Sequence, residues 1–124
     1  MRIAAICITY KRPQLLAQAL HCFLQQTHED RELIILDDAG QYRDQSGDRW
    51  RLVSKTERYS SCAAKRNAAV AMCSSKVDGL MIWDDDDIYL PHWFRTQAET
   101  LRKAEWSRPG LVLLEHGDGL KEHD

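Results

Sequence analysis

The sequence lacks the cysteine pairs and long hydrophobic runs that mark several common classes of protein. None of its four cysteines belongs to a Cys-x-x-Cys pair, which excludes a zinc ribbon and a thioredoxin-type redox site. No apolar run approaches the roughly 20 residues that a transmembrane helix needs, and the first residues show no signal-peptide cleavage pattern. We therefore expect a cytoplasmic protein without a transmembrane segment, in which the cysteines are reduced and buried.

The sequence also has little net charge and none of several nucleotide-binding and hydrolase motifs. Lysine and arginine number 17 against 19 aspartates and glutamates, a net charge of −2, which gives no global electrostatic reason to bind nucleic acid or an anionic membrane. A glycine-rich dinucleotide motif, a P-loop and a Gly-x-Ser-x-Gly elbow are absent. A receiver domain would carry an acidic pair after its first strand, where this chain has Thr9 and Tyr10.

Short apolar runs alternate with helical patterns along the 124 residues, a length typical of one domain. Continuous apolar runs are typical of strands that helices cover on both faces. Pro13 and Pro91 suit the first turns of two helices, and Ser60 or Ser61 can cap another that extends to about Cys73. The pattern predicts an α/β fold with a mainly parallel sheet. The predicted strands are 3–8, 33–36, 52–53, 80–83 and 111–114, with a loop at 41–48 and a polar, frayed tail at 115–124.

Polar residues follow three of the predicted strands. Thr9-Tyr10-Lys11-Arg12 follows the first, Asp37-Asp38 the second, and four aspartates at 84–87 the strand at 80–83. In open α/β sheets, ligands bind beyond the carboxyl ends of the strands. If the three strands are parallel neighbours, these residues share one rim of the sheet, which predicts a binding site there.

The four aspartates at 84–87 repel one another, and a divalent cation would relieve that repulsion. Mg²⁺ or Mn²⁺ prefers carboxylate, phosphate and water oxygens, and Asp84 and Asp86 could face one ion. The alternative is a solvated acidic loop. Asp37 and Asp38 either form a turn through their own backbone or accept a hydrogen bond from a base or a ribose.

Two further features have both a structural and a functional interpretation. Tyr10 is either a packing residue or a stacking platform for a base. The basic pair Lys65-Arg66 is either surface charge or a phosphate donor beside a metal.

Five segments, taken in order, resemble family 2 glycosyltransferases, which have the GT-A fold. The family pattern is Thr-Tyr-Asn-Arg, Gln-Thr, Asp-Asp-Gly-Ser, Ala-Arg-Asn-x-Gly and Asp-x-Asp-Asp-x-x-x-Pro. The matching segments are Thr9-Tyr10-Lys11-Arg12, Gln26-Thr27, Asp37-Asp38-Ala39-Gly40, Lys65-Arg66-Asn67-Ala68-Ala69, and 84–87 with Pro91. The resemblance covers residues 1–114. It implies a truncated three-layer α/β/α sandwich that forms a nucleotide-sugar-binding domain, followed by the tail at 115–124.

The resemblance implies a role for each matching residue. Tyr10, with Thr9 beside it, would stack on the base of the donor, usually uracil, and Asp38 would accept the base N–H. Arg66 would approach the diphosphate or support the acidic loop. Asp85 would bond the ribose or the sugar, and Asp86, with Asp84 as a second candidate, would hold Mn²⁺ or Mg²⁺. Arg12 belongs to the same nucleotide-sugar site.

The sequence departs from the family pattern at several positions and in its length. Lys11 replaces asparagine, Ala39-Gly40 replaces Gly-Ser, and Ala69 replaces glycine. Only 124 − 87 = 37 residues follow Asp87, whereas the family's acceptor site and general base lie further on. Glu115, followed by His116, is a weak candidate for the base that inverting transfer requires, and surface residues at a frayed end are the alternative.

Three functions therefore remain open on the sequence. The first is a metal-dependent, inverting glycosyltransferase that uses a UDP-sugar and an unknown saccharide, lipid or protein acceptor. The second is a non-catalytic nucleotide-sugar-binding half-domain. A third, phosphoryl transfer on a Toprim-like sheet, lacks the glutamate that this fold places after its first strand. Apolar area at Trp93, Trp106 and the final strand predicts a two-fold homodimer.

Overall fold

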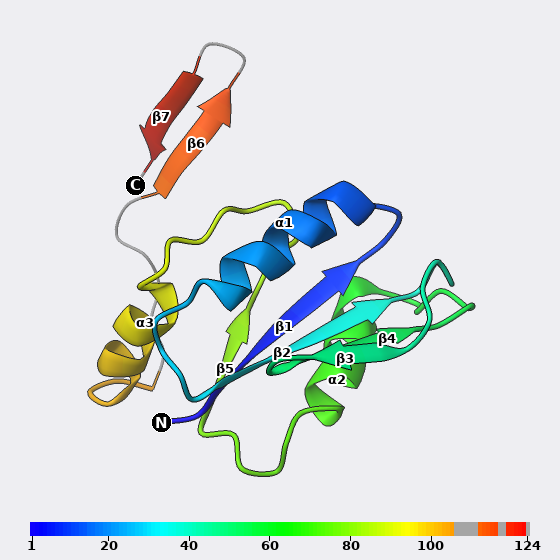
Figure 1. The fold of residues 1–124 in the computed structure, drawn as a ribbon, viewed down its shortest axis with the longest axis horizontal. Helices are drawn as coiled ribbons and strands as arrows, with labels where there is room; N and C mark the ends of the chain where they lie inside the picture. The colour runs from blue at the N-terminus through cyan, green and yellow to red at the C-terminus, as the bar shows by residue number, and fades with distance from the viewer. Residues whose placement is uncertain (106–111, 117–118, 124) are drawn as a thin grey trace.

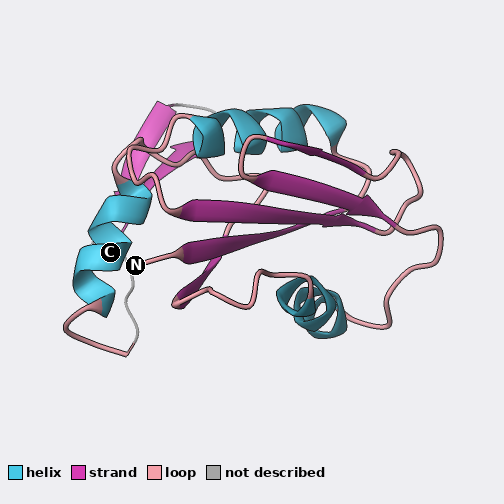
Figure 2. Ribbon diagram, turned by 60° about the horizontal axis from the view of Figure 1, so that its bottom comes forward, coloured by secondary structure: helices cyan, strands magenta, loops and turns pink. Residues whose placement is uncertain are grey.

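The computed structural model describes residues 1–105, 112–116 and 119–123. Its centre is a five-stranded sheet in the order β3-β4-β2-β1-β5, with α1 over one face and α2 over the other (Figures 1 and 2). The predicted α/β fold with a mainly parallel sheet is confirmed. The elements of the sheet and its helices are β1 (Ile3–Thr9), α1 (Pro13–Leu24), β2 (Arg31–Asp37), β3 (Gln45–Gly47), β4 (Trp50–Ser54), α2 (Cys62–Ala71), β5 (Gly79–Ile82) and α3 (Trp93–Leu101).

The apolar runs became strands because both of their faces are covered. On one side of the sheet, β1 and β2 pack with α1 and α3 through a core that includes Phe23, Trp83 and Phe94. On the other side, Ile6 and Ile34 pack in a smaller core that includes Ala69 of α2. Burial on both faces explains why these runs show no polar alternation.

Pairing registers bring the carboxyl ends of three strands together. β1 pairs in parallel with β2, with Thr9 opposite Asp37, and on its other side with β5, where Ile6 lies opposite Ile82. If the register between β1 and β5 is extended by three residues beyond Ile6 and Ile82, Thr9 lies opposite Asp85. The rim predicted from the sequence therefore exists, and the chain reaches it at the end of each central strand.

Helix boundaries follow the expected signals with one exception. α1 begins at Pro13, and Ser61 rather than Ser60 caps α2, because the Ser61 side chain accepts the N–H of Ala64. α3 begins at Trp93, two residues after Pro91. The Pro91 carbonyl is instead engaged by the N–H of Thr27, so this proline belongs to the loop that enters the helix.

Several other expectations differ from the structure. The predicted loop at 41–48 contains β3, which pairs antiparallel with β4. The last predicted strand is β6 (Val112–His116), but it does not extend the main sheet: it pairs with β7 (Gly119–His123) in a separate two-stranded sheet. β7 lies in the segment expected to be a frayed tail. Leu111 and Trp106 lie outside the described residues.

The cysteine prediction was correct in part. Cys7, Cys22, Cys62 and Cys73 are all free thiols. Cys7 and Cys22 are buried, whereas Cys62 is exposed because it begins α2 on its solvent side. No helix among the described residues is long and apolar enough to cross a membrane.

Candidate nucleotide and metal site

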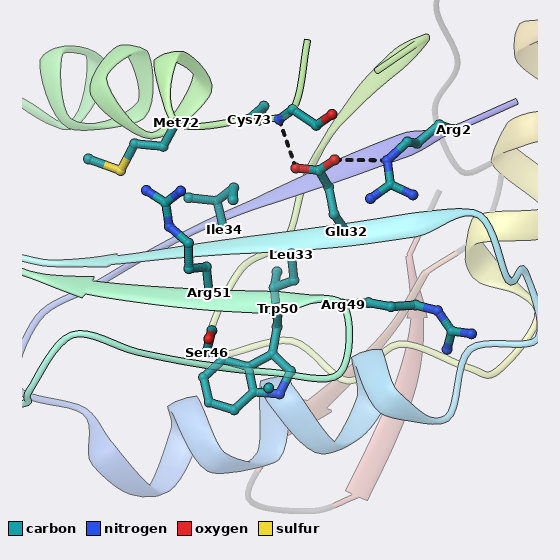
Figure 3. A pocket seen from close by; sticks show the side chains of 12 residues that line it. Arg2, Glu32, Leu33, Ile34, Ser46, Arg49, Trp50, Arg51, Met72 and Cys73 are labelled. Carbon is teal, nitrogen blue, oxygen red and sulfur yellow. Dashed lines mark hydrogen bonds and ion pairs between the residues drawn. The ribbon is translucent and has the colours of Figure 1, made fainter. Parts of the chain in front are cut away.

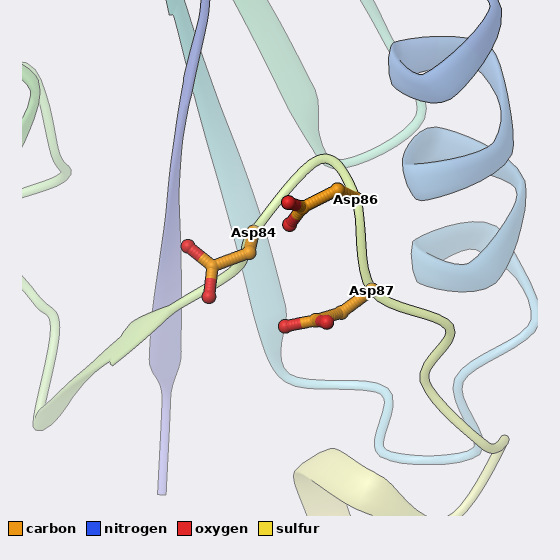
Figure 4. Close-up of side chains that lie close together, drawn as sticks. All are labelled: Asp84, Asp86 and Asp87. Carbon is orange, nitrogen blue, oxygen red and sulfur yellow. The ribbon is translucent and has the colours of Figure 1, made fainter. Parts of the chain in front are cut away.

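Three of the four aspartates after β5 converge on one point. Asp84, Asp86 and Asp87 each offer a carboxylate oxygen, and these oxygens all lie within 4.8 Å of one another. Figure 4 shows the three side chains on the loop that leaves β5, with Asp86 and Asp87 directed into the bend and Asp84 on the strand that enters it. A cluster of exposed or half-exposed carboxylates suits a hard cation such as Mg²⁺ or Mn²⁺. The structure thus adds Asp87 to the predicted pair.

Asp85 has a different environment from its three neighbours. Only 6% of it is exposed. Its Oδ2 accepts a hydrogen bond from Thr9 Oγ1 at 2.8 Å, and its Oδ1 accepts one from Arg12 Nη1 at 3.1 Å. Both oxygens are therefore engaged, which ties the acidic loop to the end of β1.

Aromatic residues and one glutamine anchor the acidic loop on the core. The Trp83 ring is fully buried, and Tyr89 stacks on it with a centroid separation of 3.8 Å. The Tyr89 hydroxyl accepts the N–H of Asp84 at 2.9 Å, and burial raises the pKa of this phenol, so it stays neutral. Further on, buried Gln26 donates to the carbonyl of Leu90 and accepts the N–H of Phe94.

Two arginines flank the acidic cluster. Arg12 Nη1 also lies 3.6 Å from Asp86 Oδ2, and Arg66 Nη2 lies 3.8 Å from Asp84 Oδ1. Burial, followed by the charges of Asp84 and Asp86, raises the pKa of Asp87. The cluster thus retains mutual repulsion that the arginines only partly offset.

Asp37 and Asp38 have separate tasks. Asp37 forms the turn, because its carboxylate accepts the N–H groups of Ala39 and Gln41 and the hydroxyl of Ser54. Gly40 completes this turn with a φ of +66°. The sequence left open whether Asp37 forms a turn or binds a base or ribose, and in the structure it forms the turn.

Asp38 is buried and bonded by three groups. Lys65 Nζ donates to Oδ1 at 2.5 Å, while the N–H of Tyr59 and Arg58 Nε donate to Oδ2 at 2.9 Å and 3.3 Å. Lys65 also donates to the carbonyl of Thr9 at 2.6 Å. Burial alone would raise the pKa of Asp38, but the hydrogen bonds from Lys65 and Tyr59 outweigh it and lower the pKa.

Tyr10 lies at the end of β1 between cationic side chains. The Arg58 guanidinium carbon is 3.6 Å from the centroid of the Tyr10 ring, and Lys11 Nζ is 5.2 Å from it. Hydrogen bonding to Lys11 and Arg58 lowers the pKa of the Tyr10 phenol. Lys11 has a φ of +54°, a conformation that asparagine adopts more readily than lysine, which gives a physical reason for the asparagine of the family pattern.

A hollow of about 410 Å³ lies away from this site, at the amino-terminal ends of the strands (Figure 3). Among its lining residues, Glu32 accepts hydrogen bonds from Arg2 Nε at 2.9 Å and from the N–H of Ser74 at 3.0 Å. Its buried charge is therefore satisfied within the protein. The polar residues of the rim and this hollow therefore lie at opposite ends of the sheet.

A family model described as glycosyl transferase family 2 matches residues 4–106, most of the chain. The chain belongs to glycosyltransferase family 2. Its sequence is 29% identical over 127 residues to the uncharacterized glycosyltransferase YwdF of Bacillus subtilis, covering 98% of this chain and 47% of that protein. The chain therefore spans about half the length of this curated relative.

Solved structures share the GT-A fold of this family member. S. aureus TarS, residues 1–349 in complex with UDP, has a TM-score of 0.68 at 16% identity, and the match covers 85% of this chain and 33% of that one. The mannosyltransferase PcManGT from Pyrobaculum calidifontis, in complex with GDP-Man and Mn²⁺, has a TM-score of 0.55 at 22% identity, covering 71% and 28%. At these identities the likeness establishes the fold.

Most residues proposed from the sequence meet at the rim of this family 2 domain. The structure brings eight of them together: Thr9, Tyr10, Arg12, Asp38, Arg66, Asp84, Asp85 and Asp86. Glu115 lies in β6, within the separate two-stranded sheet, so it is not on a strand that ends at the rim.

Sequence reasoning assigned no role to Arg58 and Asp87, and treated Lys65 only as half of a basic pair. The sequence contains one indication that Lys65 is buried. It lies four positions before Ala69 on the alanine-rich helix α2, so the two share a face, and the structure buries both. A lysine on the buried face of a short helix needs a counter-charge. Arg58 comes from the loop between β4 and α2, and no local pattern indicates its contact with Tyr10.

Proposed function

We propose that this domain binds a UDP-sugar as its nucleotide-diphosphate donor, together with Mn²⁺ or Mg²⁺. It transfers the sugar to an acceptor. The observation that carries the proposal is the convergence of Asp84, Asp86 and Asp87 at the carboxyl end of β5. Ligands of open α/β sheets bind at this edge. A UDP complex and a GDP-Man complex with Mn²⁺ among the structural neighbours support it.

The proposed roles follow from the contacts of each residue. Asp86 and Asp84, with Asp87, would hold the cation, whose chemistry is to neutralise charge on the departing diphosphate. Arg66, with 40% of its side chain exposed beside Asp84, would contact the phosphates. Thr9 and Arg12 hold Asp85 and thereby orient the acidic loop, while Tyr10 would lie beside the base of the donor.

The acceptor side of the reaction concerns the proton that the acceptor hydroxyl must lose. Inverting transfer needs a base for the acceptor hydroxyl, and Glu115 is the candidate from the sequence. Glu115 lies in β6, in the separate two-stranded sheet and not on a strand that ends at the rim. This position favours a second candidate function: a nucleotide-sugar-binding domain that transfers nothing by itself. The free thiols are consistent with a cytoplasmic location.

The binding proposal is tested by thermal unfolding with UDP, with and without Mn²⁺ or Mg²⁺. At 100 times its dissociation constant a ligand adds about 2.7 kcal/mol, which is a melting shift on the order of 10 °C for a domain of this size. We expect the shift with UDP and cation together, a smaller one with ADP, and none after EDTA. The absence of any cation-dependent shift with either nucleotide would overturn the site.

Hydrolysis of UDP-sugars in the presence of Mn²⁺ separates the two candidate functions. A transferase that lacks its acceptor still releases UDP slowly to water, so UDP release that requires the cation supports catalysis. Binding of UDP with Mn²⁺ but no release from UDP-glucose or UDP-N-acetylglucosamine supports the non-catalytic domain. The variant Asp86→Asn serves as the blank for both measurements.

A further inference from the structure

The hollow at the amino-terminal ends of the strands lies where α2 no longer covers the sheet (Figure 3). α2 ends at Ala71. Val53 of β4 is buried in the core that this helix closes, whereas Arg51, two residues earlier on the same face of the strand, is exposed. The volume of about 410 Å³ is within the range of small-molecule sites.

The charge around this hollow is opposite in sign to the net charge of the chain. Three arginines and one carboxylate line it, an excess of two positive charges in a chain with a net charge of −2. The carboxylate is that of Glu32, which Arg2 Nε and the N–H of Ser74 already engage. The positive charge that remains belongs to Arg49 and Arg51, so the hollow is suited to an anion.

Arg51 has no carboxylate partner in the part of the chain that the structure describes. It lies opposite Ile34 of β2, and Figure 3 shows its side chain extending beside Ile34 toward Met72. Burial raises the pKa of the Cys73 thiol on the same wall, and the charge of Arg51 opposes that rise. An unpaired guanidinium therefore lies against an apolar floor.

Arg49 has a backbone conformation that is unfavourable for arginine. Its φ is +65° in the turn between β3 and β4, where hairpins favour glycine or asparagine. Its ion pairs with Asp48 and Glu29, at 3.3 Å and 3.5 Å, join carboxylates that are mostly exposed, and such pairs add little stability. The fold alone gives no reason for an arginine here, whereas an anion beside it does.

We propose that this hollow is a second ligand site, which binds a small organic oxyanion with an apolar substituent. Arg51 donates to the anionic group, Arg49 adds a second positive charge, and the substituent lies on Ile34 and Met72. Guanidinium groups bind phosphate and carboxylate oxygens in the same paired geometry. No residue of the rim takes part, so binding requires neither UDP nor a divalent cation.

The first test titrates the unaltered chain with phenyl phosphate and with benzoate, without divalent cation, and follows the amide NMR signals of Arg51 and Ser74. Inorganic phosphate carries only charge and phenol only the ring. Each should bind at least about tenfold more weakly than the better anion, because it lacks either the buried ring or the ionic contact. The better of phenyl phosphate and benzoate identifies the anionic group.

Two results of this titration would overturn the inference: no binding of either anion, or binding of inorganic phosphate as tight as that of the better anion. UDP with Mn²⁺ is measured on the same sample. Its binding does not depend on this hollow, so failure of the second site and failure of the proposed function are distinguished.

Arg51→Gln tests the anionic contact. We expect the better anion to bind about tenfold more weakly, which is the effect of losing one charge-assisted hydrogen bond. Stability should not change, because Arg51 has no carboxylate to lose. Arg95→Gln, at an exposed arginine of α3, is the matched control and should bind as the unaltered chain does. Unchanged affinity in Arg51→Gln would overturn the inference.

Arg49→Gly separates binding from folding at the second arginine. Glycine adopts a positive φ without strain, so the variant should unfold at an equal or higher urea concentration. The better anion should nevertheless bind about threefold more weakly, because a nearby positive charge is gone. Full affinity, or a marked loss of stability, would show that Arg49 serves the fold and would overturn its place in the site.

Discussion

Lys65 of α2 donates a 2.5 Å hydrogen bond to Asp38, which follows β2, and both side chains are almost completely buried. The same ammonium group donates to the carbonyl of Thr9 at the end of β1. One buried cation therefore joins a helix to the ends of two neighbouring strands, directly beneath the proposed base site.

Removal of Lys65 should destabilise the fold strongly. Lys65→Met removes the buried cation of Asp38 and leaves that carboxylate with the more exposed Arg58 and the N–H of Tyr59, which costs about 3 kcal/mol. Adding Asp38→Asn should recover part of that loss, because the poorly compensated charge is then gone. Urea unfolding of the single and double variants measures both effects. Lys76→Met, at an exposed lysine, should unfold within about 0.5 kcal/mol of the unaltered chain.

The ionised form of Asp38 should make the fold sensitive to acid. Its folded pKa lies below the ordinary value of 3.8, so the unfolded state binds more protons in that region. The stabilisation is complete above the unfolded pKa and is lost as the pH falls through the folded pKa. Urea unfolding between about pH 5 and about pH 2 should therefore show a shallower pH dependence for Asp38→Asn. Exposed Asp48→Asn should keep the steeper dependence of the unaltered chain.

Asp86→Asn should abolish the cation-dependent shift with UDP and leave the fold intact. Loss of one carboxylate from a repelling cluster leaves apo stability unchanged or slightly raised. Differential scanning fluorimetry with UDP and Mn²⁺ measures the shift, and Asp48→Asn should retain it. A variant that unfolds, or one that keeps the full shift, would show that Asp86 is not the cation ligand.

The edge of the sheet should mediate association with a second copy of the chain. β5 is one of the two edge strands of the five-stranded sheet, and its residues Leu80 and Ile82 are 52% and 54% exposed. An uncovered apolar edge strand pairs readily with another strand, and two-fold pairing is the commonest closed arrangement. Trp93, named from the sequence, is instead half-buried against the core.

Light scattering at micromolar concentration should therefore give twice the mass of the chain. Leu80→Lys with Ile82→Lys should give the mass of one chain, because charge on the edge opposes pairing. Leu15→Lys, at an exposed leucine of α1, is the control and should remain dimeric. A single-chain mass for the unaltered protein would refute the homodimer.

The sequence by itself determined the local features of this protein. Continuous apolar runs specified β1 and β2, because strands covered on both faces have no polar side. Pro13 and a serine marked the starts of α1 and α2, because each satisfies or removes a free N–H of the first turn. Aspartates directly after a buried strand indicated the cation site, because charged side chains must reach solvent and the buried strand therefore ends before them.

Tertiary structure decided which of those residues share a contact. The parallel register between β1 and β5 sets Asp85 against Thr9, so this carboxylate is buried and bonded while Asp84, Asp86 and Asp87 face outward. Packing of α2 on the sheet buries Lys65 and directs it to Asp38, and a loop brings Arg58 onto Tyr10. These pairs are separated by 27 to 76 residues, so their contacts depend on strand register and layer packing, which no local pattern encodes.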